Sequence, residues 1–296
     1  MAWQAPDLSG RVAVVTGASR GVGRGIALAL GDCGATVYVT GRSTRSAGAG
    51  ATPGAPAGPG TVDDAAEAVS ARGGRGIAAP TDHTDDDRVA ALFARVAEEQ
   101  DGRLDLVVAN AWGGYEGDVQ AEFARPFWEG STDRWDAMFT SGLRAQFTTA
   151  RAAAPALIAT PGSALVITGG TDLDGFYLGN VAYDVVKAAS SRLVVALARE
   201  LRAHDVAVVG VYPGFTRTEA VVAAFAAQGA QPPAETHSPE FVGRAVAAVL
   251  ADPDRMALSG TGAQAATFAA RYGFADVDGA TVAPFVLPDE FRLASS

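Results

Sequence analysis

The chain has 296 residues, 48% of them hydrophobic, which is enough to bury a substantial core. Its formal net charge of −10 disfavours a protein that binds nucleic-acid phosphates. A single cysteine, Cys33, excludes an internal disulfide, and three dispersed histidines give no metal-ligand spacing, so we expect neither a nucleic-acid partner nor a metal. No apolar run reaches the ~18 residues of a membrane span and no signal segment opens the chain, so we expect a cytoplasmic protein without membrane contact.

Residues 11–30, RVAVVTGASRGVGRGIALAL, predict a strand, a glycine-rich turn and a helix. The glycines allow a tight turn and the close approach of a pyrophosphate to the backbone N–H groups of the helix N-terminus. This pattern indicates a dinucleotide-binding βαβ unit. The segment GASRG over 17–21 also matches the elbow of α/β-hydrolases, so a serine hydrolase with Ser19 as nucleophile, and Asp205 and His237 as its partners, is a rival interpretation.

Residues 35–40 form the second predicted strand, and its end indicates which cofactor binds. An acidic side chain there would bind the ribose hydroxyls of NAD, whereas an arginine accommodates the 2′-phosphate of NADP. Thr40 and Gly41 supply no acid, and Arg42 and Arg20 supply positive charge. We therefore expect NADP(H) as the cofactor.

The next stretch, residues 46–60, consists almost entirely of Ala, Gly, Pro and Ser, a composition that predicts a flexible insertion. Beyond it the patterns predict a helix over 61–72, a strand over 76–79 and a second helix that opens at Thr84, with Asp82 just before it. A fourth strand over 104–109 leads into Asn110-Ala111-Trp112, and the aromatic residues of the following loop, 113–129, suit a core as well as a pocket wall.

Strands and helices continue to alternate to the end of the chain. The remaining predicted elements are helices over 131–160, 178–202 and 239–250 and strands over 162–168, 206–212 and 256–258. This order predicts a single domain over 1–296, of the α/β class, with a Rossmann-type doubly wound parallel sheet of about seven strands and helices on both faces. The apolar outer faces of the helices over 131–160 and 178–202 predict a homodimer or homotetramer.

The helix over 178–202 carries the chemistry. Tyr183 and Lys187 are four residues apart and so lie on one helical face, one turn apart. A cation within a few ångströms lowers the pKa of a tyrosine by roughly 1 to 3 units, which makes the phenol usable as an acid or base near neutral pH. Lys187 is the only lysine among 23 cationic residues, which indicates a position where a guanidinium would not substitute.

The glycine turn, Asn110, the Tyr183/Lys187 pair and residues 213–216 (PGFT) together resemble the short-chain dehydrogenase/reductase superfamily, over residues 11 to about 219. Within it, the segments FWEGSTDRWD, YDVVKAASSRLVVALARELR and YGFADVDG look most like the dehydrogenase/reductase member 1 type and its bacterial relatives.

The resemblance implies an oxidoreductase that transfers a hydride between nicotinamide and a ketone, aldehyde or secondary alcohol. Tyr183 would protonate the carbonyl oxygen during reduction, while Lys187 would bind the nicotinamide ribose, and residues 215–238 would form a substrate lid. The residues implied in cofactor binding are Gly17, Ser19, Arg20, Gly21, Val22, Gly23, Arg42, Asp82, Asn110, Lys187, Pro213, Gly214 and Thr216.

The chain departs from the family pattern at three positions. Gly170 stands where the catalytic serine is expected, and Thr168 or Thr171 would have to supply the hydroxyl that holds the substrate carbonyl. Gly142 stands at the position of the catalytic asparagine, and Trp112 replaces a glycine beside the cofactor. These departures leave open a second interpretation, an NADP(H)-binding protein with impaired catalysis.

Overall fold

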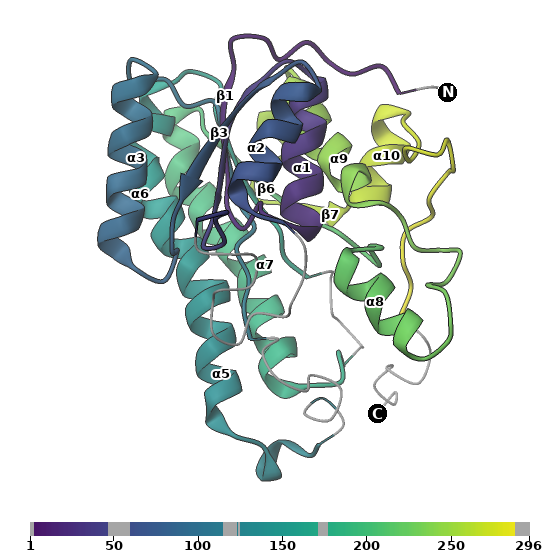
Figure 1. The fold of residues 1–296 in the computed structure, drawn as a ribbon. Helices are drawn as coiled ribbons and strands as arrows, with labels where there is room; N and C mark the ends of the chain where they lie inside the picture. The colour runs from purple at the N-terminus through teal and green to yellow at the C-terminus, as the bar shows by residue number, and fades with distance from the viewer. Residues whose placement is uncertain (1–2, 47–59, 115–122, 124, 171–176, 288–296) are drawn as a thin grey trace.

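A computed structural model describes residues 3–46, 60–114, 123, 125–170 and 177–287. Its centre is one sheet of seven parallel strands in the order β3-β2-β1-β4-β5-β6-β7 (Figure 1). The strands are β1 Val12–Val15, β2 Thr36–Gly41, β3 Arg75–Pro80, β4 Leu106–Ala109, β5 Ala164–Ile167, β6 Ala207–Tyr212 and β7 Gly262–Gln264. The predicted doubly wound α/β fold is thereby confirmed.

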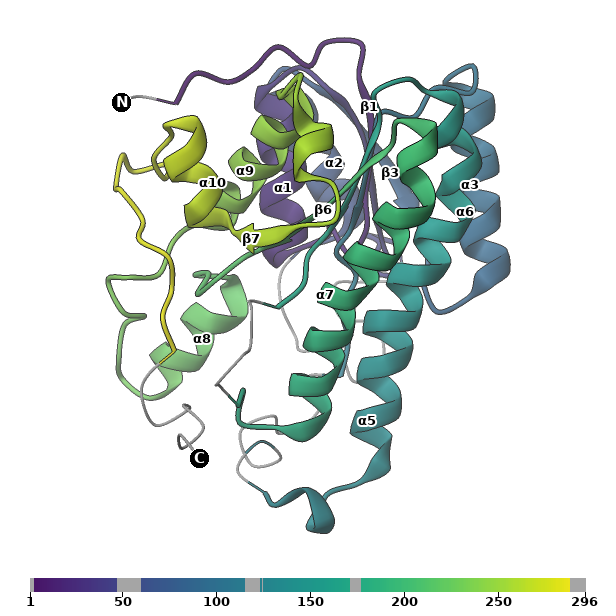
Figure 2. The same ribbon diagram turned by 180° about the vertical axis from the view of Figure 1, so that it is seen from behind.

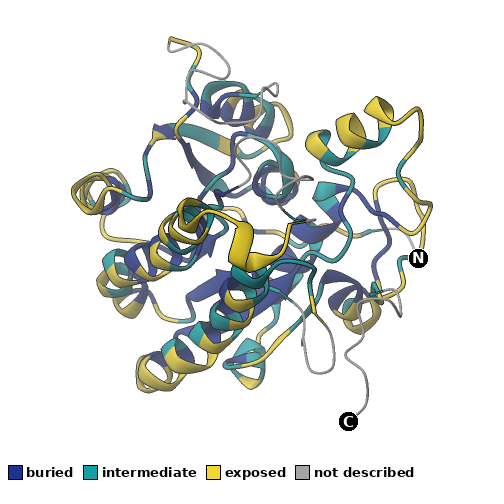
Figure 3. Ribbon diagram, turned by 90° about the horizontal axis from the view of Figure 1, so that it is seen from below, coloured by how far each residue is buried: buried dark blue, intermediate teal, exposed yellow. Residues whose placement is uncertain are grey.

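Helices cover both faces of the sheet, because each parallel crossover must return the chain across a face. α1 (Gly21–Asp32), α2 (Val62–Ala71), α9 (Pro239–Ala251) and α10 (Ala265–Tyr272) lie on one side, as Figures 1 and 2 show. The other side carries α3 (Asp86–Glu99), α6 (Ala145–Ala159) and α7 (Val181–Leu201). Seen from below, these helices turn their buried side to the sheet and their exposed side outward (Figure 3).

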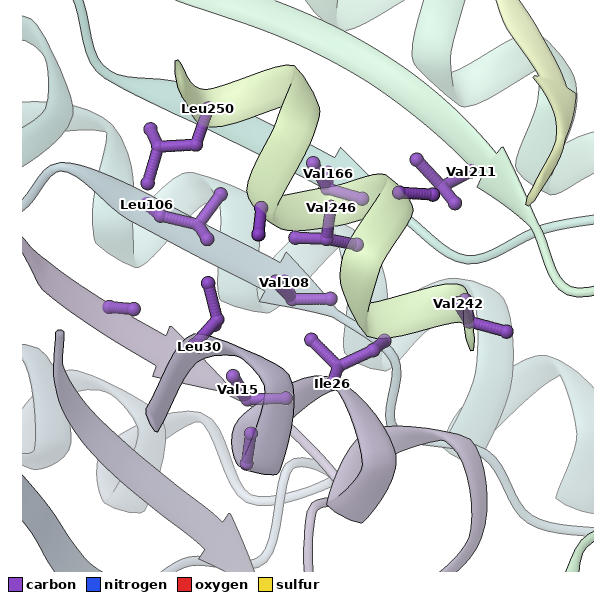
Figure 4. Close-up of a cluster of buried hydrophobic side chains, with 14 of the residues drawn as sticks. Val15, Ile26, Leu30, Leu106, Val108, Val166, Val211, Val242, Val246 and Leu250 are labelled. Atoms are coloured by element: carbon purple, nitrogen blue, oxygen red, sulfur yellow. The ribbon is translucent and has the colours of Figure 1, made fainter. Parts of the chain in front are cut away.

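The core on the first side is built where α1 and α9 pack against the sheet (Figure 4). Each Val, Leu or Ile buried in this way stabilises the fold by about 1.5–3 kcal/mol relative to an exposed side chain. The side chains that meet there are Ile26 and Leu30 of α1, Val242, Val246 and Leu250 of α9, and Val15, Leu106, Val108, Val166 and Val211 of the strands. Cys33, directly after α1, is buried, and burial raises the pKa of its thiol to about 12.

One long, nearly continuous helical segment extends past the carboxyl edge of the sheet (Figures 1 and 2). It consists of α5 (Thr132–Met138), a π-helical turn η2 (Phe139–Arg144) and α6, and this α5–η2–α6 rod covers most of the single helix predicted over 131–160. A π turn widens the helix locally and is frequent at functional sites. Gly142 lies within this turn and is buried. The α5–η2–α6 rod and α7 together flank the carboxyl ends of the strands.

The C-terminal part differs from the sequence prediction. The strand predicted over 256–258 is wrong: Arg255–Leu258 form a 3₁₀ helix, η4, and β7 follows it at Gly262–Gln264. Met, Ala and Leu favour helices, whereas a strand of Gly-Ala-Gln has no apolar alternation to reveal it. α10 was not predicted. The short helix α8 (Glu219–Ala227) lies within the expected lid, on the α9 side of the carboxyl edge (Figures 1 and 2).

Two expectations concern residues outside the described part of the chain. They are the insertion predicted over 46–60, of which only the two end residues are described, and the hydroxyl of Thr171. Two short helices, η1 (Phe127–Glu129) and η3 (Arg202–His204), complete the secondary structure in the described part of the chain. Among the residues described, no helix is long and apolar enough to cross a membrane.

Candidate active site

A cavity of about 660 Å³ opens at the carboxyl ends of β1, β2, β4 and β5. The strand order reverses between β1 and β4, which is the switch point where ligands bind in open α/β sheets. Most of the residues predicted for cofactor binding line this cavity: Gly17, Ser19, Arg20, Gly21, Val22, Gly23, Arg42, Asp82, Asn110, Lys187 and Pro213.

The glycine turn fits a dinucleotide. A Cβ on Gly23 would overlap the Gly17 carbonyl oxygen and the Asn110 side-chain amide, so the first turn of α1 can pack this closely only with glycine there. Gly21, with φ of +57°, begins α1, and a Cβ there would meet nothing nearer than 3.7 Å, so there is open space beside this turn. The Gly21 N–H donates to the Glu219 carboxylate at 3.0 Å, which marks this helix N-terminus as a place where an anion such as a pyrophosphate would bind.

Asn110 joins the ends of three neighbouring strands. Its amide nitrogen donates to the backbone oxygens of Thr16 (2.9 Å) and Gly17 (3.3 Å), after β1. Its Oδ1 accepts from the hydroxyl of Thr168, directly after β5, at 3.2 Å. Asn110 itself follows β4, so this one side chain fixes the floor of the cavity where β1, β4 and β5 end.

The adenosine side of the cavity carries Arg42 and Asp82. Arg42 is exposed, and the described part of the chain gives it no ion pair. Burial opposes ionisation of Asp82, but hydrogen bonds from the Thr84 N–H and hydroxyl and the charge of Arg42 hold its pKa below the usual value. Arg20 donates to the Ser43 hydroxyl at 2.9 Å. Two guanidinium groups therefore border the end of β2, as the sequence suggested.

Tyr183 and Lys187 lie on the first two turns of α7, which begins at Val181. The Asn180 side chain caps this helix by accepting from the Tyr183 N–H at 3.1 Å. Lys187 Nζ lies 5.4 Å from the centre of the Tyr183 ring. Burial lowers the pKa of Lys187 to about 7, and the residue faces the cavity. The phenol and the ammonium are thus neighbours, as their spacing requires.

Aromatic rings surround this pair. The Trp112 and Tyr183 rings meet edge to face, with centres 5.7 Å apart, and Phe123 lies 5.6 Å from Tyr183. Lys187 Nζ lies over the Trp112 ring, 3.6 Å from its centre. Of the aromatic residues predicted over 113–129, Phe123 therefore joins the site, whereas Phe127 and Trp128 are exposed.

Packing limits which residue can supply the hydroxyl in place of the catalytic serine. A Cβ on Gly170 would lie 2.8 Å from the Lys187 Cβ, so a serine does not fit at that position as the backbone stands. Thr168 lines the cavity and is buried, and its hydroxyl is hydrogen-bonded to Asn110. Gln146 of α6 donates to the Thr168 carbonyl at 3.1 Å and fixes the end of β5.

The segment after β6 differs from the residue assignment made from sequence. Thr216 is buried, and neither it nor Gly214 lines the cavity. The threonine of this segment that lines the cavity is Thr218, which caps α8 and has its Cγ2 3.7 Å from the position of a Cβ on Gly21. The family resemblance assigns Thr216 to cofactor binding as the last residue of the PGFT segment, 213–216. The buried bridge from Thr216 to His237 turns the chain, so the cavity-facing threonine comes two residues later.

Several cavity residues were missed from the sequence, and two of them are Glu219 and Ser141. Glu219 accepts a hydrogen bond from the Gly21 N–H at 3.0 Å, and Ser141, in the π turn, lines the cavity beside Trp112. The only available signal for either was position: Glu219 follows the capping threonine of the lid helix, and Ser141 precedes the glycine at the family's asparagine position.

The hydrolase interpretation is wrong. Ser19 follows β1 at the carboxyl edge of the sheet, whereas Asp205 precedes β6 and so lies at the opposite edge. His237 has both ring nitrogens on backbone carbonyls, those of Pro213 (2.6 Å) and Ser238 (3.0 Å). The three residues therefore do not assemble into a triad.

Comparisons with known proteins agree with this geometry. A family model described as short chain dehydrogenase matches residues 11–229. The mouse dehydrogenase/reductase SDR family member 1 is 35% identical over 93% of this chain and 86% of its own length, and the human protein of that name is 34% identical over 95% and 88%. A crystal structure of a short chain dehydrogenase from Mycobacterium thermoresistibile superposes with a TM-score of 0.76, at 25% identity, over 94% of this chain and 92% of that one.

Proposed function

Because the chain belongs to the short-chain dehydrogenase/reductase family, whose members use nicotinamide cofactors, we propose that it is an NADP(H)-dependent oxidoreductase acting on a ketone or aldehyde, or on a secondary alcohol in reverse. The observation that carries the proposal is the position of Lys187, which lines the cavity that the glycine turn borders, with Tyr183 one helical turn away and packed against Trp112 of the cavity wall. Tyr183 would be the catalytic acid and base.

When bound, the nicotinamide supplies or accepts the hydride. The chain's own residues would do the rest: Tyr183 gives its phenolic proton to the carbonyl oxygen during reduction, and Lys187 stabilises the phenolate that remains. The aromatic side chains of Trp112 and Phe123 border the ring of Tyr183. Thr168, fixed between Asn110 and Gln146, is the described hydroxyl best placed to hold the carbonyl oxygen.

The preference for NADP(H) rests on the end of β2. Gly41 carries no acid that would bind the ribose hydroxyls of NAD, and Arg42 and Arg20 place positive charge there. A relative from Mycobacterium tuberculosis, 33% identical over 70% of this chain, is named as an NAD-dependent oxidoreductase, so cofactor choice is measured separately from activity.

A second candidate, a nucleotide-binding protein without turnover, is favoured by glycine at positions 142 and 170. A panel of ketones, aldehydes and secondary alcohols, followed by absorbance of the reduced cofactor, separates the two. We expect turnover with some members, lost by at least about 10² in Tyr183→Phe, because general acid catalysis contributes ~10²–10⁴. Cofactor affinity should stay nearly unchanged in that variant. Binding without any turnover would favour the second candidate, and turnover that survives Tyr183→Phe would remove the phenol from the mechanism.

A further inference from the structure

We propose that Trp112 is a positioning residue for Lys187: its indole ring fills the space left by the missing side chain at Gly142, covers the ammonium and excludes water from that side. The inference deepens the proposed function, since Lys187 acts there on the phenol of Tyr183. The packing of Trp112 against Gly142 and Lys187 can be tested even if the protein shows no oxidoreductase activity.

The first observation is steric. A Cβ on Gly142 would lie 2.8 Å from Cζ3 and 3.0 Å from Cε3 of Trp112, both shorter than ordinary carbon contacts. Gly142 is buried in the π turn and Trp112 follows β4, so neither can move freely away from the other. Any side chain at position 142 would displace the indole. The tryptophan and the glycine are therefore a matched pair, not two separate departures from the family pattern.

The second observation is electrostatic. Lys187 Nζ lies 3.6 Å from the centre of the Trp112 ring, which is contact distance for an ammonium on the face of an indole. That face attracts a cation but cannot accept its proton. On the side toward η2, Lys187 thus meets an aromatic surface where the family's asparagine would have offered polar groups.

The third observation comes from the opposite side of the lysine. A Cβ on Gly170 would approach the Lys187 Cβ to 2.8 Å, so the stem of the lysine packs directly on the backbone after β5. All three departures from the family pattern, at 112, 142 and 170, therefore touch Lys187 or the ring that covers it. Together they change the surroundings of the lysine while Tyr183 and Lys187 themselves are kept.

A double-mutant cycle tests the steric pairing. Alanine is a better helix former than glycine, so Gly142→Ala should be neutral or stabilising wherever its methyl group has room. In the protein with Trp112, we expect Gly142→Ala to lower the urea concentration at the unfolding midpoint. In the Trp112→Ala background, we expect Gly142→Ala to leave this midpoint unchanged or to raise it. The same effect of Gly142→Ala in both backgrounds would overturn the pairing. If Trp112→Ala does not fold, Trp112→Leu replaces it with the same expectation.

Because Lys187 is the only lysine of the chain, its titration directly tests whether the Trp112 ring covers its ammonium group. In protein labelled with [13C]lysine, the single Cε signal titrates with Lys187 alone. Trp112→Ala removes both the cover over the ammonium and the attraction of the indole face. Because burial is the cause that lowers the pKa of Lys187, we expect the admitted water to outweigh the lost attraction and to raise that pKa by roughly one unit or more. Trp112→Phe should keep it low. Trp135→Ala is the control, since Trp135 stacks on Phe139 and does not line the cavity. An unchanged or lowered pKa in Trp112→Ala, or an equal rise in the control, would overturn the proposal.

The pH profile of turnover links the two proposals. A raised pKa of Lys187 should move the pH dependence of kcat to higher pH in Trp112→Ala and not in Trp135→Ala. If the wild-type protein turns over no substrate, the unfolding cycle and the titration still decide the role of Trp112. If turnover depends on Tyr183 but the cycle shows no coupling and the titration does not move, the inference fails and the proposed function stands.

Discussion

Glu219 accepts a hydrogen bond from the backbone N–H of Gly21 at 3.0 Å, and this contact joins the first residue of the lid helix α8 to the first residue of α1. A carboxylate at a helix N-terminus satisfies free N–H groups and the positive end of the helix dipole. A pyrophosphate would use the same groups. Glu219 therefore lies where the cofactor phosphates are expected, and the two anions would compete for the same N–H groups.

From this contact we predict that Glu219→Gln strengthens NADPH binding. The substitution keeps the size of the side chain and removes the charge, and a carboxylate at a helix N-terminus contributes about 0.3–1 kcal/mol, so a roughly two- to fivefold lower Kd is expected. Isothermal titration calorimetry measures the change. Glu235→Gln, an exposed residue of the same lid region, is the matched control and should leave Kd unchanged. Weaker binding in Glu219→Gln would show that the carboxylate supports the site.

Arg42→Ala should remove most of the preference for NADPH over NADH. A hydrogen bond to a charged group contributes about 1.5–3 kcal/mol, so the NADPH Kd should rise roughly 10- to 100-fold while the NADH Kd changes little. Arg45→Ala is the control, because Arg45 is held by Asp64 and Glu67 at the surface. A preference for NADH in the wild-type protein would contradict the assignment of the end of β2.

Lys187 should make the stability of the cofactor-free protein depend on pH. Its pKa falls from 10.5 in the unfolded chain to about 7 in the folded protein because of burial. Between these values the unfolded chain binds a proton that the folded protein does not, so the free energy of unfolding should rise as pH rises from about 7 to about 10. Lys187→Met lacks this contribution. Urea unfolding of the wild-type protein and of Lys187→Met between about pH 7 and about pH 10 isolates the contribution of Lys187. Parallel pH dependences of the two unfolding free energies would disprove this prediction.

We propose a homo-oligomer that forms through the outer faces of η2, α6 and α7. A mostly apolar groove runs between them. Its apolar lining consists of Phe139, Leu143, Phe147, Ala189, Leu193 and Ala196, and Thr140, Arg144 and Arg192 complete it. Phe147 is 49% exposed and lies among the other apolar side chains of this groove, and a contiguous apolar surface of this kind marks an interaction site. Phe147→Glu should therefore lower the mass in light scattering, to that of one chain from a dimer or of two chains from a tetramer. Val222→Glu, on α8, is the control. A wild-type monomer at micromolar concentration would refute the proposal.

The sequence by itself determined what depends on local spacing. Alternating strands and helices predict a parallel sheet, because residues near in sequence decide each element and crossovers have one hand. Tyr183 and Lys187 fall on one helical face for the same reason, since four residues make about one turn. The glycine turn is equally local: its conformation is set within a few residues of Gly17.

Only the tertiary structure decided which distant segments meet. Trp112, Gly142 and Lys187 come from a loop, a π turn and a helix, and no periodicity links them. Thr218 rather than Thr216 lines the cavity because of how the segment after β6 folds back toward α1. The contact of Glu219 with Gly21, across 198 positions of sequence, depends on the same packing. Such contacts follow from close packing, in which a missing Cβ admits a ring from elsewhere, and packing is a property of the assembled fold.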